Sequence, residues 1–567
     1  MAKFALRAAL VCSILMYTQA WQVPQVRSRL QSKSVVNPVS LNSLKKSPFS
    51  SPTENYLGSL RMSSSDDSEQ KGLKALIPTK TERKKLLPLA GMLFCILFNY
   101  TILRDTKDVL VVTAPGSGAE IIPFLKTYVN LPISILLTIV YSQLTNVMSA
   151  ANVFYTILGS FLGFFAAFPT LIYPFRDTLH PNALCDFLME KLPIVFYPFI
   201  SMLRNWTYAI FYTMAQIWGS MVLSLLFWGF SNEVTSVPEA KKYYPLFGLL
   251  ANVALIFSGQ YVRFVSDIRS KLPDGVDAWG VSLNYLMGAV VAMGGVIAGL
   301  YNHMQKNVLT DPECVPELRA KKKKEKVSMS LGESAKYLAG SPYIRYLAML
   351  VIGYGMSINI VEVTWKGKLK EAFPDPNAYA AFMGNFSTAT GTVTLVMMIL
   401  GRFILEKFGW GVAALITPLT LAATGAGFFT LILGGDKFLP FFEKLGTTPL
   451  MAACIIGAAQ NIASKSTKYS LFDPSKEMAY IPLDQEQKTK GKAAIDVIGN
   501  PLGKSGGSFI QQVLIATFGS LAASTPYLGA ILFVVTGGWI FSAGKLAPLF
   551  EEAMKKKEAE DAAAAEA

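Results

Sequence analysis

Long apolar stretches, separated by short polar or Gly/Pro-containing breaks, fill the chain from residue 86 onward. Each stretch is long enough to cross a hydrocarbon core of about 30 Å, which takes around 20 helical residues. A segment in lipid has to satisfy its own backbone hydrogen bonds, and at this length and hydropathy only a helix does so. The pattern predicts twelve transmembrane helices: 86–104, 119–144, 152–173, 198–230, 243–266, 278–302, 343–366, 378–405, 410–435, 447–472, 490–522 and 526–546.

The longest break divides these segments six and six. An even count places three basic groups on one side of the membrane, as the positive-inside rule requires. They precede the first segment, occupy the break and follow the last segment: Lys80, Arg83, Lys84 and Lys85; Arg319, Lys321, Lys322, Lys323, Lys324 and Lys326; Lys555, Lys556 and Lys557. We therefore predict an all-α membrane protein of major-facilitator-like architecture, with its site near mid-membrane between two halves. The units are a six-helix half (86–302), a basic central loop (303–342), a second six-helix half (343–546) and a charged tail (547–567).

The region before the first segment reads as a targeting leader. Residues 1–20 have a basic start, an apolar run and a small-residue end, which is typical of a signal peptide. Residues 21–75 are rich in serine and basic side chains, which is typical of a transit peptide or a disordered tail. A bipartite leader of this kind resembles plastid targeting in algae with a complex plastid, and the alternative is a simple signal peptide followed by a disordered tail.

The composition is typical of a membrane protein and argues against a nucleic-acid-binding, disulfide-rich or metal-binding protein. Apolar residues make up 52% of the 567 residues, charged residues make up 16%, and the mean hydropathy is +0.37. The net charge of +14 does not indicate a nucleic-acid partner, because no separate basic domain carries it. Five cysteines and two histidines, all widely spaced, predict no disulfide framework, metal site or cofactor.

Charged side chains inside the apolar segments are the candidates for function. Each costs about 2.5–3.5 kcal/mol in a bilayer even on the lenient scale, so it normally faces a protein-lined or water-filled path. The cationic excess over 465–504, between two apolar segments, predicts an anionic cargo. The candidates are Lys107, Lys126, Gln216, Arg263, Glu362, Asn385, Lys468 and Lys504.

Two of these candidates have alternative interpretations. Lys107 belongs to RDTKD, where Arg104 and Lys107 share a helix face, so the motif is either part of the site or an internally paired helix end. Glu362 is four residues before Lys366, so it forms either a stabilising pair on its own helix or an ion pair with a lysine of another segment.

Glycines give three further predictions. Gly159 with Gly163 and Gly295 with Gly299 have the small-xxx-small spacing that permits close helix packing. The string GNPLGKSGG resembles a phosphate-binding loop, but the first outer glycine position holds Ile498 and no strand precedes it. We predict instead a glycine-bounded break in a helix.

Several long strings closely resemble the plastidial and intracellular-bacterial ATP/ADP translocases: RDTKDVLVVTAPGSGAEIIPFLK, YYPLFGLLANVALIFSGQ, INIVEVTWK, SKSTKYSLFDPSKEMAYIPLD and KGKAAIDVIGNPLGKSGG. The resemblance covers about residues 85 to 548. It implies twelve spans in the inner plastid envelope and exchange of ATP for ADP, with no enzymatic activity. The family's four charged transport residues map onto Lys126, Gln216, Glu362 and Lys504, and the second of them is glutamate in the family pattern.

The resemblance leads to an alternating-access hypothesis. Lysines in a shared chamber give charge-assisted bonds to the phosphates of ATP and ADP, and only the loaded carrier passes through occlusion. The expected partners are ATP, ADP and the lipid bilayer. The chain is expected to be a monomer, and the resemblance leaves open whether phosphate or protons are transported as well. The alternative is a proton-linked or broader-specificity nucleoside triphosphate importer of the same fold.

Overall fold

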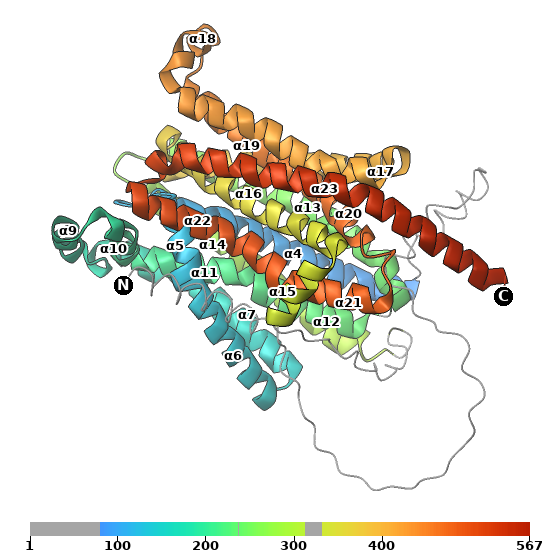
Figure 1. Ribbon diagram of the computed structural model, residues 1–567. Coiled ribbons are helices and arrows are strands. Elements are labelled where there is room, and N and C mark those ends of the chain that lie inside the picture. The colour runs from blue at the N-terminus through green and yellow to red at the C-terminus, as the bar shows by residue number, and fades with distance from the viewer. Residues whose placement is uncertain (1–79, 236, 312–313, 315–330, 567) are drawn as a thin grey trace.

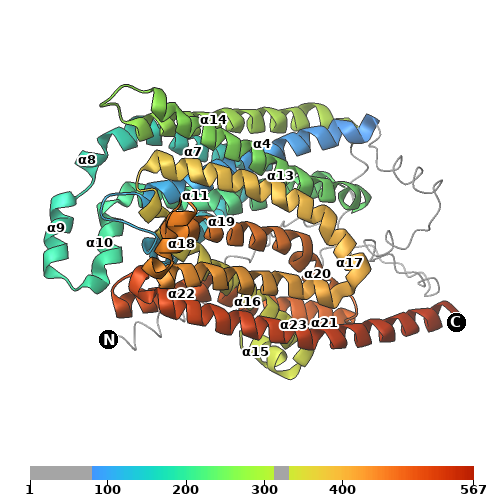
Figure 2. The same ribbon diagram turned by 90° about the horizontal axis from the view of Figure 1, so that it is seen from above.

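The computed structural model describes residues 80–235, 237–311, 314 and 331–566. The predicted leader (1–20 and 21–75) and the lysine run of the central loop lie outside the described residues. The described chain is helical throughout and forms two groups of helices side by side (Figures 1 and 2), which we call the N-half (80–311) and the C-half (331–566).

The N-half contains six crossings and a short helical excursion. Its elements are α4 (Lys80–Val112); α5 (Ile121–Phe124), η1 (Leu125–Asn130) and α6 (Leu131–Val147); α7 (Ala150–Ala167), η2 (Phe168–Ile172), η3 (Tyr173–Phe175) and α8 (Arg176–Leu179); α9 (Asn182–Lys191), η4 (Ile194–Phe196) and α10 (Tyr197–Arg204); α11 (Trp206–Trp218), η5 (Gly219–Phe227) and α12 (Trp228–Val234); α13 (Val237–Asp267) and η6 (Ile268–Lys271); α14 (Ala278–His303) and η7 (Met304–Val308).

The C-half also crosses six times. Its elements are α15 (Leu331–Gly340) and α16 (Pro342–Ala372); α17 (Pro376–Gly434) with η8 (Gly435–Phe438) and α18 (Leu439–Lys444); α19 (Pro449–Thr467) with η9 (Lys468–Phe472) and α20 (Asp473–Met478); α21 (Gln485–Ala494), η10 (Ile495–Gly499) and α22 (Asn500–Phe518); and α23 (Leu521–Glu566). Gly409 has a positive φ of 78° and divides α17 into two crossings, which left-handed backbone at a glycine permits.

All twelve predicted segments fall on helices. Within the described ranges, nine helices are long and apolar enough to span a membrane, and one of these is the double-length α17. The two remaining crossings, α19 and α22, are less apolar because they carry lysines, serines and glycines among their apolar residues. Some predicted boundaries are wrong. The first crossing continues past residue 104 to Val112, where the charged residues are buried and paired, and the last helix continues past residue 546 to Glu566.

The two ends of the bundle differ (Figure 1). The terminal face holds the start of α4, the end of α14 and the end of α23, while the far face holds α9, α10 and α18. The basic residues at the start of α4 and those toward the end of α23 thus share one face, whereas the basic residues of the central loop lie outside the described residues. An ion pair of 3.0 Å between Lys84 and Asp311 joins the first crossing to the start of the central loop.

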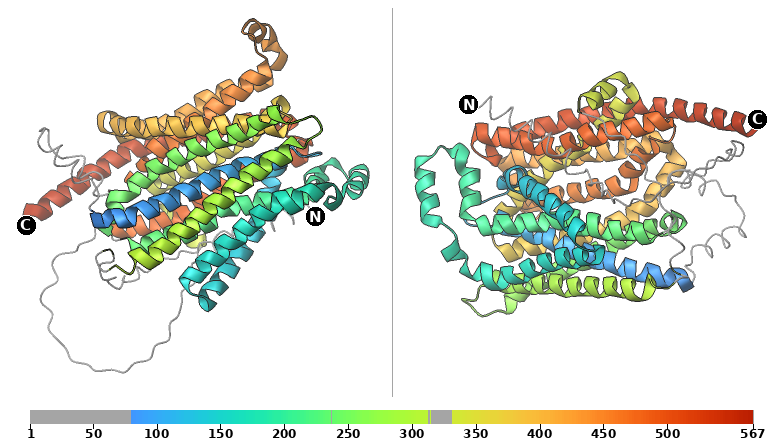
Figure 3. Two further views of the ribbon diagram at one scale, coloured as in Figure 1. Left: turned by 180° about the vertical axis from the view of Figure 1, so that it is seen from behind. Right: turned by 90° about the horizontal axis from the view of Figure 1, so that it is seen from below.

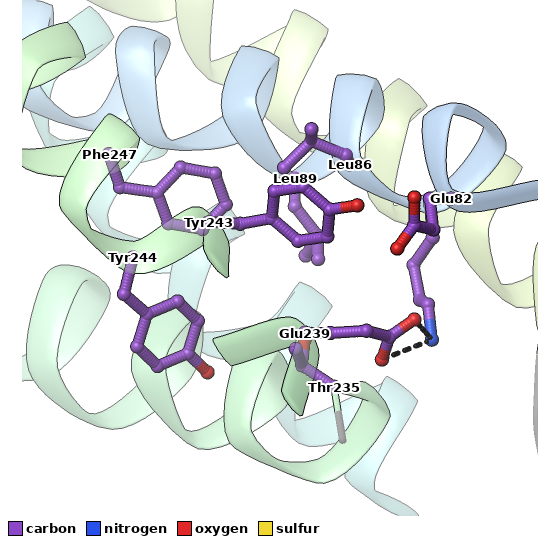
Figure 4. A pocket seen from close by; sticks show the side chains of 9 residues that line it. Glu82, Leu86, Leu89, Thr235, Glu239, Tyr243, Tyr244 and Phe247 are labelled. Atoms are coloured by element: carbon purple, nitrogen blue, oxygen red, sulfur yellow. Dashed lines mark hydrogen bonds and ion pairs between the residues drawn. The ribbon is translucent and has the colours of Figure 1, made fainter. Parts of the chain in front are cut away.

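At the terminal face, ion pairs and hydrogen bonds to the backbone join helices of the same half to one another. In the N-half, buried Lys85 of α4 pairs with Glu239 of α13 at 2.8 Å, beside Tyr243 and Phe247 (Figure 4). In the C-half, Trp410 donates to the Ser475 carbonyl at 2.8 Å.

Glu477 belongs to the same terminal-face region of the C-half. Burial raises the pKa of Glu477, but Lys492, which donates to it at 2.9 Å, and Lys476 together outweigh burial and leave this pKa below its ordinary value. The carboxylate is therefore held in its charged form.

The halves touch along two seams. Along the first, α13 packs against α17, and along the second, α5 and η1 pack against α22. At the second seam Gln512 donates to the Pro123 carbonyl at 3.0 Å and to the Thr127 hydroxyl at 2.7 Å. Beyond η1, α6 diverges from the bundle, as seen in Figure 3, and none of its residues is buried. The second seam therefore closes toward the far face.

The glycine predictions are wrong, and the structure shows why. A Cβ at Gly159, Gly163, Gly295 or Gly299 would meet nothing within 4 Å, so these glycines do not permit any close approach. The predicted break at GNPLGKSGG is also wrong, because α22 is a continuous helix there. Its Gly503 packs against the α16 backbone, where an added Cβ would lie 3.0 Å from a carbonyl oxygen.

Candidate functional site

Four charged residues lie in the far half of α4. Arg104 pairs with Asp105 at 3.0 Å, and Lys107 pairs with Asp108 at 3.0 Å. Both carboxylates are almost completely buried, with side-chain exposures of 1% and 2%. The motif is therefore buried within the bundle, and it is internally paired, as one of the two predicted interpretations stated.

One ion pair from this motif crosses between the halves. Lys366 of α16 lies 2.8 Å from the second Asp108 oxygen and 3.0 Å from Glu362 on its own helix. Lys465 of α19 approaches the same Glu362 oxygen at 3.9 Å. Both predicted alternatives for Glu362 thus occur together, because it pairs within α16 and also with a lysine of another crossing.

A second polar link joins the halves beside the first. Arg104 of the N-half donates to the Ser387 hydroxyl of α17 at 2.8 Å, and that hydroxyl donates to Asp105 at 2.7 Å. Ser387 is fully buried. The hydroxyl therefore serves as acceptor and donor at once, which satisfies it in a region closed to water.

Lys126 reaches the same region from η1. Its ammonium donates to Asn359 Oδ1 on α16 at 3.0 Å, and Lys126 interacts electrostatically with Glu362. Lys126 lies in the π-helical turn η1, which follows Pro123, and π-turns inside helices recur at functional sites. This turn places Lys126 toward the C-half.

We call these eight residues the central charge cluster: Arg104, Asp105, Lys107, Asp108, Lys126, Glu362, Lys366 and Lys465. Five are basic and three are acidic, so the cluster carries an excess of two positive charges. Fixed charges in a low-dielectric interior are stable only when they are paired and hydrogen-bonded. The cluster therefore has more cations than carboxylates, an arrangement that suits the binding of an anion.

Aromatic rings cover the cluster. The Lys107 ammonium lies 3.8 Å from the centre of the Tyr212 ring, and Lys465 lies 5.1 Å from the Phe386 ring. Both distances fall within the range of cation–π attraction. The rings thus hold two lysines that the three carboxylates do not fully neutralise.

The other predicted site residues are distributed as follows. Gln216 is exposed on α11, one turn after Tyr212, and takes no part in the ion pairs and hydrogen bonds described above. Lys504 is placed on α22, but its side chain lies outside what the structure describes. Lys468 pairs with Asp473 on the terminal side of the cluster.

Two predicted residues are not brought to the cluster. Arg263 stands near the end of α13, 41% exposed, and pairs with Asp267 at 3.3 Å. Asn385 is exposed on α17, next to the buried Gly384 at the first seam. Neither takes part in the ion pairs described above.

Sequence reasoning left Asp105, Asp108 and Lys366 out of the site. Asp105 and Asp108 looked self-neutralising within RDTKD, and Lys366 looked like the stabilising partner of Glu362. The signal that identifies them is the length of the first crossing, because a 33-residue helix that ends at Val112 places both aspartates inside it. Lys465 was visible in the cationic stretch but was not among the chosen residues.

Comparisons with known proteins agree with this architecture. The model of the family described as TLC ATP/ADP transporter matches residues 62–550. A bacterial homologue of the iron transporter ferroportin, solved in an inward-facing state, is similar in fold, with a TM-score of 0.52 at 13% identity over 82% of this chain and 99% of that one.

Curated relatives are much closer in sequence. The chain is 56% identical to ADP,ATP carrier protein 2, chloroplastic, of Arabidopsis thaliana over 85% of this chain and 77% of that protein. It is 53% identical to ADP,ATP carrier protein 1 of Chlamydia trachomatis over 85% of this chain and 92% of that protein. With a family model that matches most of its length, this chain belongs to the TLC ATP/ADP transporter family.

Proposed function

We propose that this protein exchanges ATP for ADP across a plastid membrane by alternating access. The observation that carries the proposal is the central charge cluster, which lies between two six-helix halves and has more cations than carboxylates. ATP and ADP are polyanions, and lysine and arginine form short charge-assisted hydrogen bonds to phosphate oxygens. The relatives named above are ADP,ATP carriers.

Charge balance explains why exchange is favoured over net transport. In the empty carrier, Asp108 and Glu362 hold Lys366 and Lys465 in internal pairs, yet positive charge remains unbalanced. Occlusion of that charge is costly because it removes the remaining hydration. A bound phosphate chain neutralises the excess, so the loaded carrier passes through the occluded state more readily than the empty one.

Lys107, Lys126, Lys366, Lys465 and Lys504 are assigned to the phosphates. Glu362 is assigned to restrain two of these lysines when no nucleotide is bound, which agrees with its pairs at 3.0 and 3.9 Å. Gln216 lines the site as a neutral hydrogen-bonding group. Because glutamine does not titrate, the mechanism has no proton-coupled step at position 216. The nucleotide is transported without any chemical change.

Location and assembly complete the proposal. The chloroplast relatives and the predicted bipartite leader support the inner envelope of a complex plastid as the site of this multi-pass protein. Both halves of the site belong to one chain, so a monomer contains every group that the mechanism uses. Protons and inorganic phosphate are not required as co-substrates.

The test is uptake of labelled ATP into vesicles that contain purified protein. Vesicles preloaded with ADP or ATP are expected to take up at least tenfold more label than empty vesicles. Lys126→Ala and Lys366→Ala are expected to lower the rate at least tenfold, whereas Lys306→Ala, on the terminal side of α14, should leave it unchanged. Equal uptake into loaded and empty vesicles would contradict exchange, and uptake driven by a proton gradient would instead establish proton-linked import.

A further inference from the structure

A group of tyrosines lies immediately on the terminal side of the central charge cluster. Tyr100 precedes Arg104 by one turn of α4, and Tyr354 precedes Glu362 by about two turns of α16. Both helices run from the terminal face to the far face. Tyr469 follows Lys465 by one turn at the start of η9, in a crossing that runs the opposite way. Three crossings therefore contribute a tyrosine to the same side.

Tyr469 has an accessible ring and a charged neighbour. Its side chain is 52% exposed, and the ammonium of Lys468 lies 4.4 Å from the ring centre. The same ammonium lies 5.5 Å from the Tyr354 ring and 2.5 Å from Asp473. Tyr354 is already stacked on Phe472 at 5.4 Å, so the ring with an exposed face is that of Tyr469.

Tyr469 is one helical turn after Lys465, a member of the central charge cluster. It is near enough to Tyr100 of the N-half for the two side chains to interact electrostatically. The Tyr100 ring itself rests on Gly219 of η5, where an added Cβ would come within 2.9 Å of it. This close contact limits the room in which the Tyr100 ring can move.

We propose that Tyr469 and Lys468 form the nucleobase end of the transport site, with the phosphates of the same nucleotide directed toward Lys465 and Lys366. This inference rests on the proposed nucleotide exchange and adds an orientation to it. The base stacks on the exposed Tyr469 ring, and Lys468 leaves Asp473 to contact the ribose or the first phosphate. In this orientation a nucleotide that enters from the terminal side leads with its phosphates, and a nucleotide that enters from the far side leads with its base.

Physical chemistry favours this assignment over a purely electrostatic site. Stacking of a base on an aromatic ring contributes about 1–3 kcal/mol and tolerates any base, because every base has a π-face. Lys468 beside the ring adds a cation near the 5′ end of the ribose, where the phosphate chain begins. The phosphate-binding lysines then supply most of the charge recognition, and Tyr469 distinguishes a nucleotide from a bare polyphosphate.

Equilibrium binding to the detergent-purified full chain tests the proposal. Labelled ATP is displaced by unlabelled ATP and, separately, by inorganic tripolyphosphate. Tyr469→Ala is expected to raise the Kd for ATP about tenfold, by loss of stacking, and to leave the Kd for tripolyphosphate unchanged. Tyr469→Phe keeps the ring and is expected to bind ATP as the wild type does. Tyr285→Ala, at an equally exposed tyrosine of α14, is the matched control.

A second variant covers the case in which Tyr469→Ala misfolds. In Tyr469→Trp, ATP is expected to quench the fluorescence of the new indole, whereas tripolyphosphate leaves it unchanged. An unaltered Kd for ATP in Tyr469→Ala, or equal losses for ATP and tripolyphosphate, overturns the assignment of the base. Failure of the proposed function looks different, because the wild type would then show no counter-exchange in vesicles.

Discussion

At the scale of single residues, Lys366 joins the two halves most directly. It is 6% exposed, and it lies within 3.0 Å of one carboxylate from each half. Asp108 is 2% exposed and has Lys107 as a second partner. Removal of one member of a buried ion pair leaves a charge without compensation, which costs about 3–5 kcal/mol. Lys366 is therefore a stability determinant of the resting carrier as well as a proposed phosphate ligand.

Lys366→Met is expected to destabilise the protein by about 3 kcal/mol because Asp108 and Glu362 lose their shared cation. Addition of Asp108→Asn is expected to restore part of the lost stability. A double-mutant cycle, based on thermal unfolding in detergent, measures the interaction free energy between the two positions. The matched control is Lys368→Met on the same helix, whose partner Glu371 is 50% exposed, with an expected cost below about 1 kcal/mol. Strict additivity of the two substitutions would contradict a direct pair.

At the scale of elements, the first seam is a crossing of α13 and α17 at glycines. A Cβ at Gly259 would lie 2.6 Å from the Gly384 carbonyl oxygen, and a Cβ at Gly384 would lie 2.7 Å from the Gly259 carbonyl oxygen. Backbone atoms do not move aside as side chains do. Small residues are the usual means of such close approach between transmembrane helices. The seam therefore depends on both positions lacking a side chain.

Gly384→Ala is expected to separate α13 from α17 and to lower the exchange rate at least tenfold, with a loss of stability of about 1–3 kcal/mol from overpacking. Rates in proteoliposomes and thermal unfolding of the same preparations measure the two effects. Gly295→Ala on α14, where an added Cβ would meet nothing within 4 Å, should behave as the wild type does. Equal effects of the two substitutions would remove the seam from the mechanism.

At the scale of the whole molecule, the ends of the bundle are unlike each other. Toward the far face, Lys370 of α16 donates to the Ser117 carbonyl, and Ser282 donates to Asn377 at 2.6 Å, so contacts between the halves continue past the charge cluster. On the terminal side, α6 diverges without any buried residue. Nucleotide binding between the halves should therefore stabilise the fold as a unit.

The rise in unfolding temperature of the purified carrier is expected to be largest with ATP and to decrease from ATP to ADP, AMP and adenosine. Each phosphate that is lost leaves more of the excess positive charge of the cluster without a partner. A ligand at 100 times its Kd stabilises by about 2.7 kcal/mol. Differential scanning fluorimetry over a concentration series measures the shifts. A shift by adenosine as large as that by ATP would show that phosphate charge does not control binding.

Hydropathy alone determined the twelve crossings and their division into two halves. These properties depend on local length and apolarity, which any one segment carries by itself. The family likeness further indicated Lys126, Glu362 and Lys504 as transport residues. Asp105 and Asp108, however, looked self-neutralising in the sequence.

Tertiary structure decided which charges meet. Whether Lys366 pairs only with Glu362 or also with Asp108 depends on how α16 approaches α4, and no local pattern contains that information. The same holds for glycines, because the spacing of Gly295 and Gly299 resembles a packing motif while the real close approach lies at Gly259 and Gly384. Pairing in an apolar interior is set by contacts between distant crossings, and these exist only once the halves have packed.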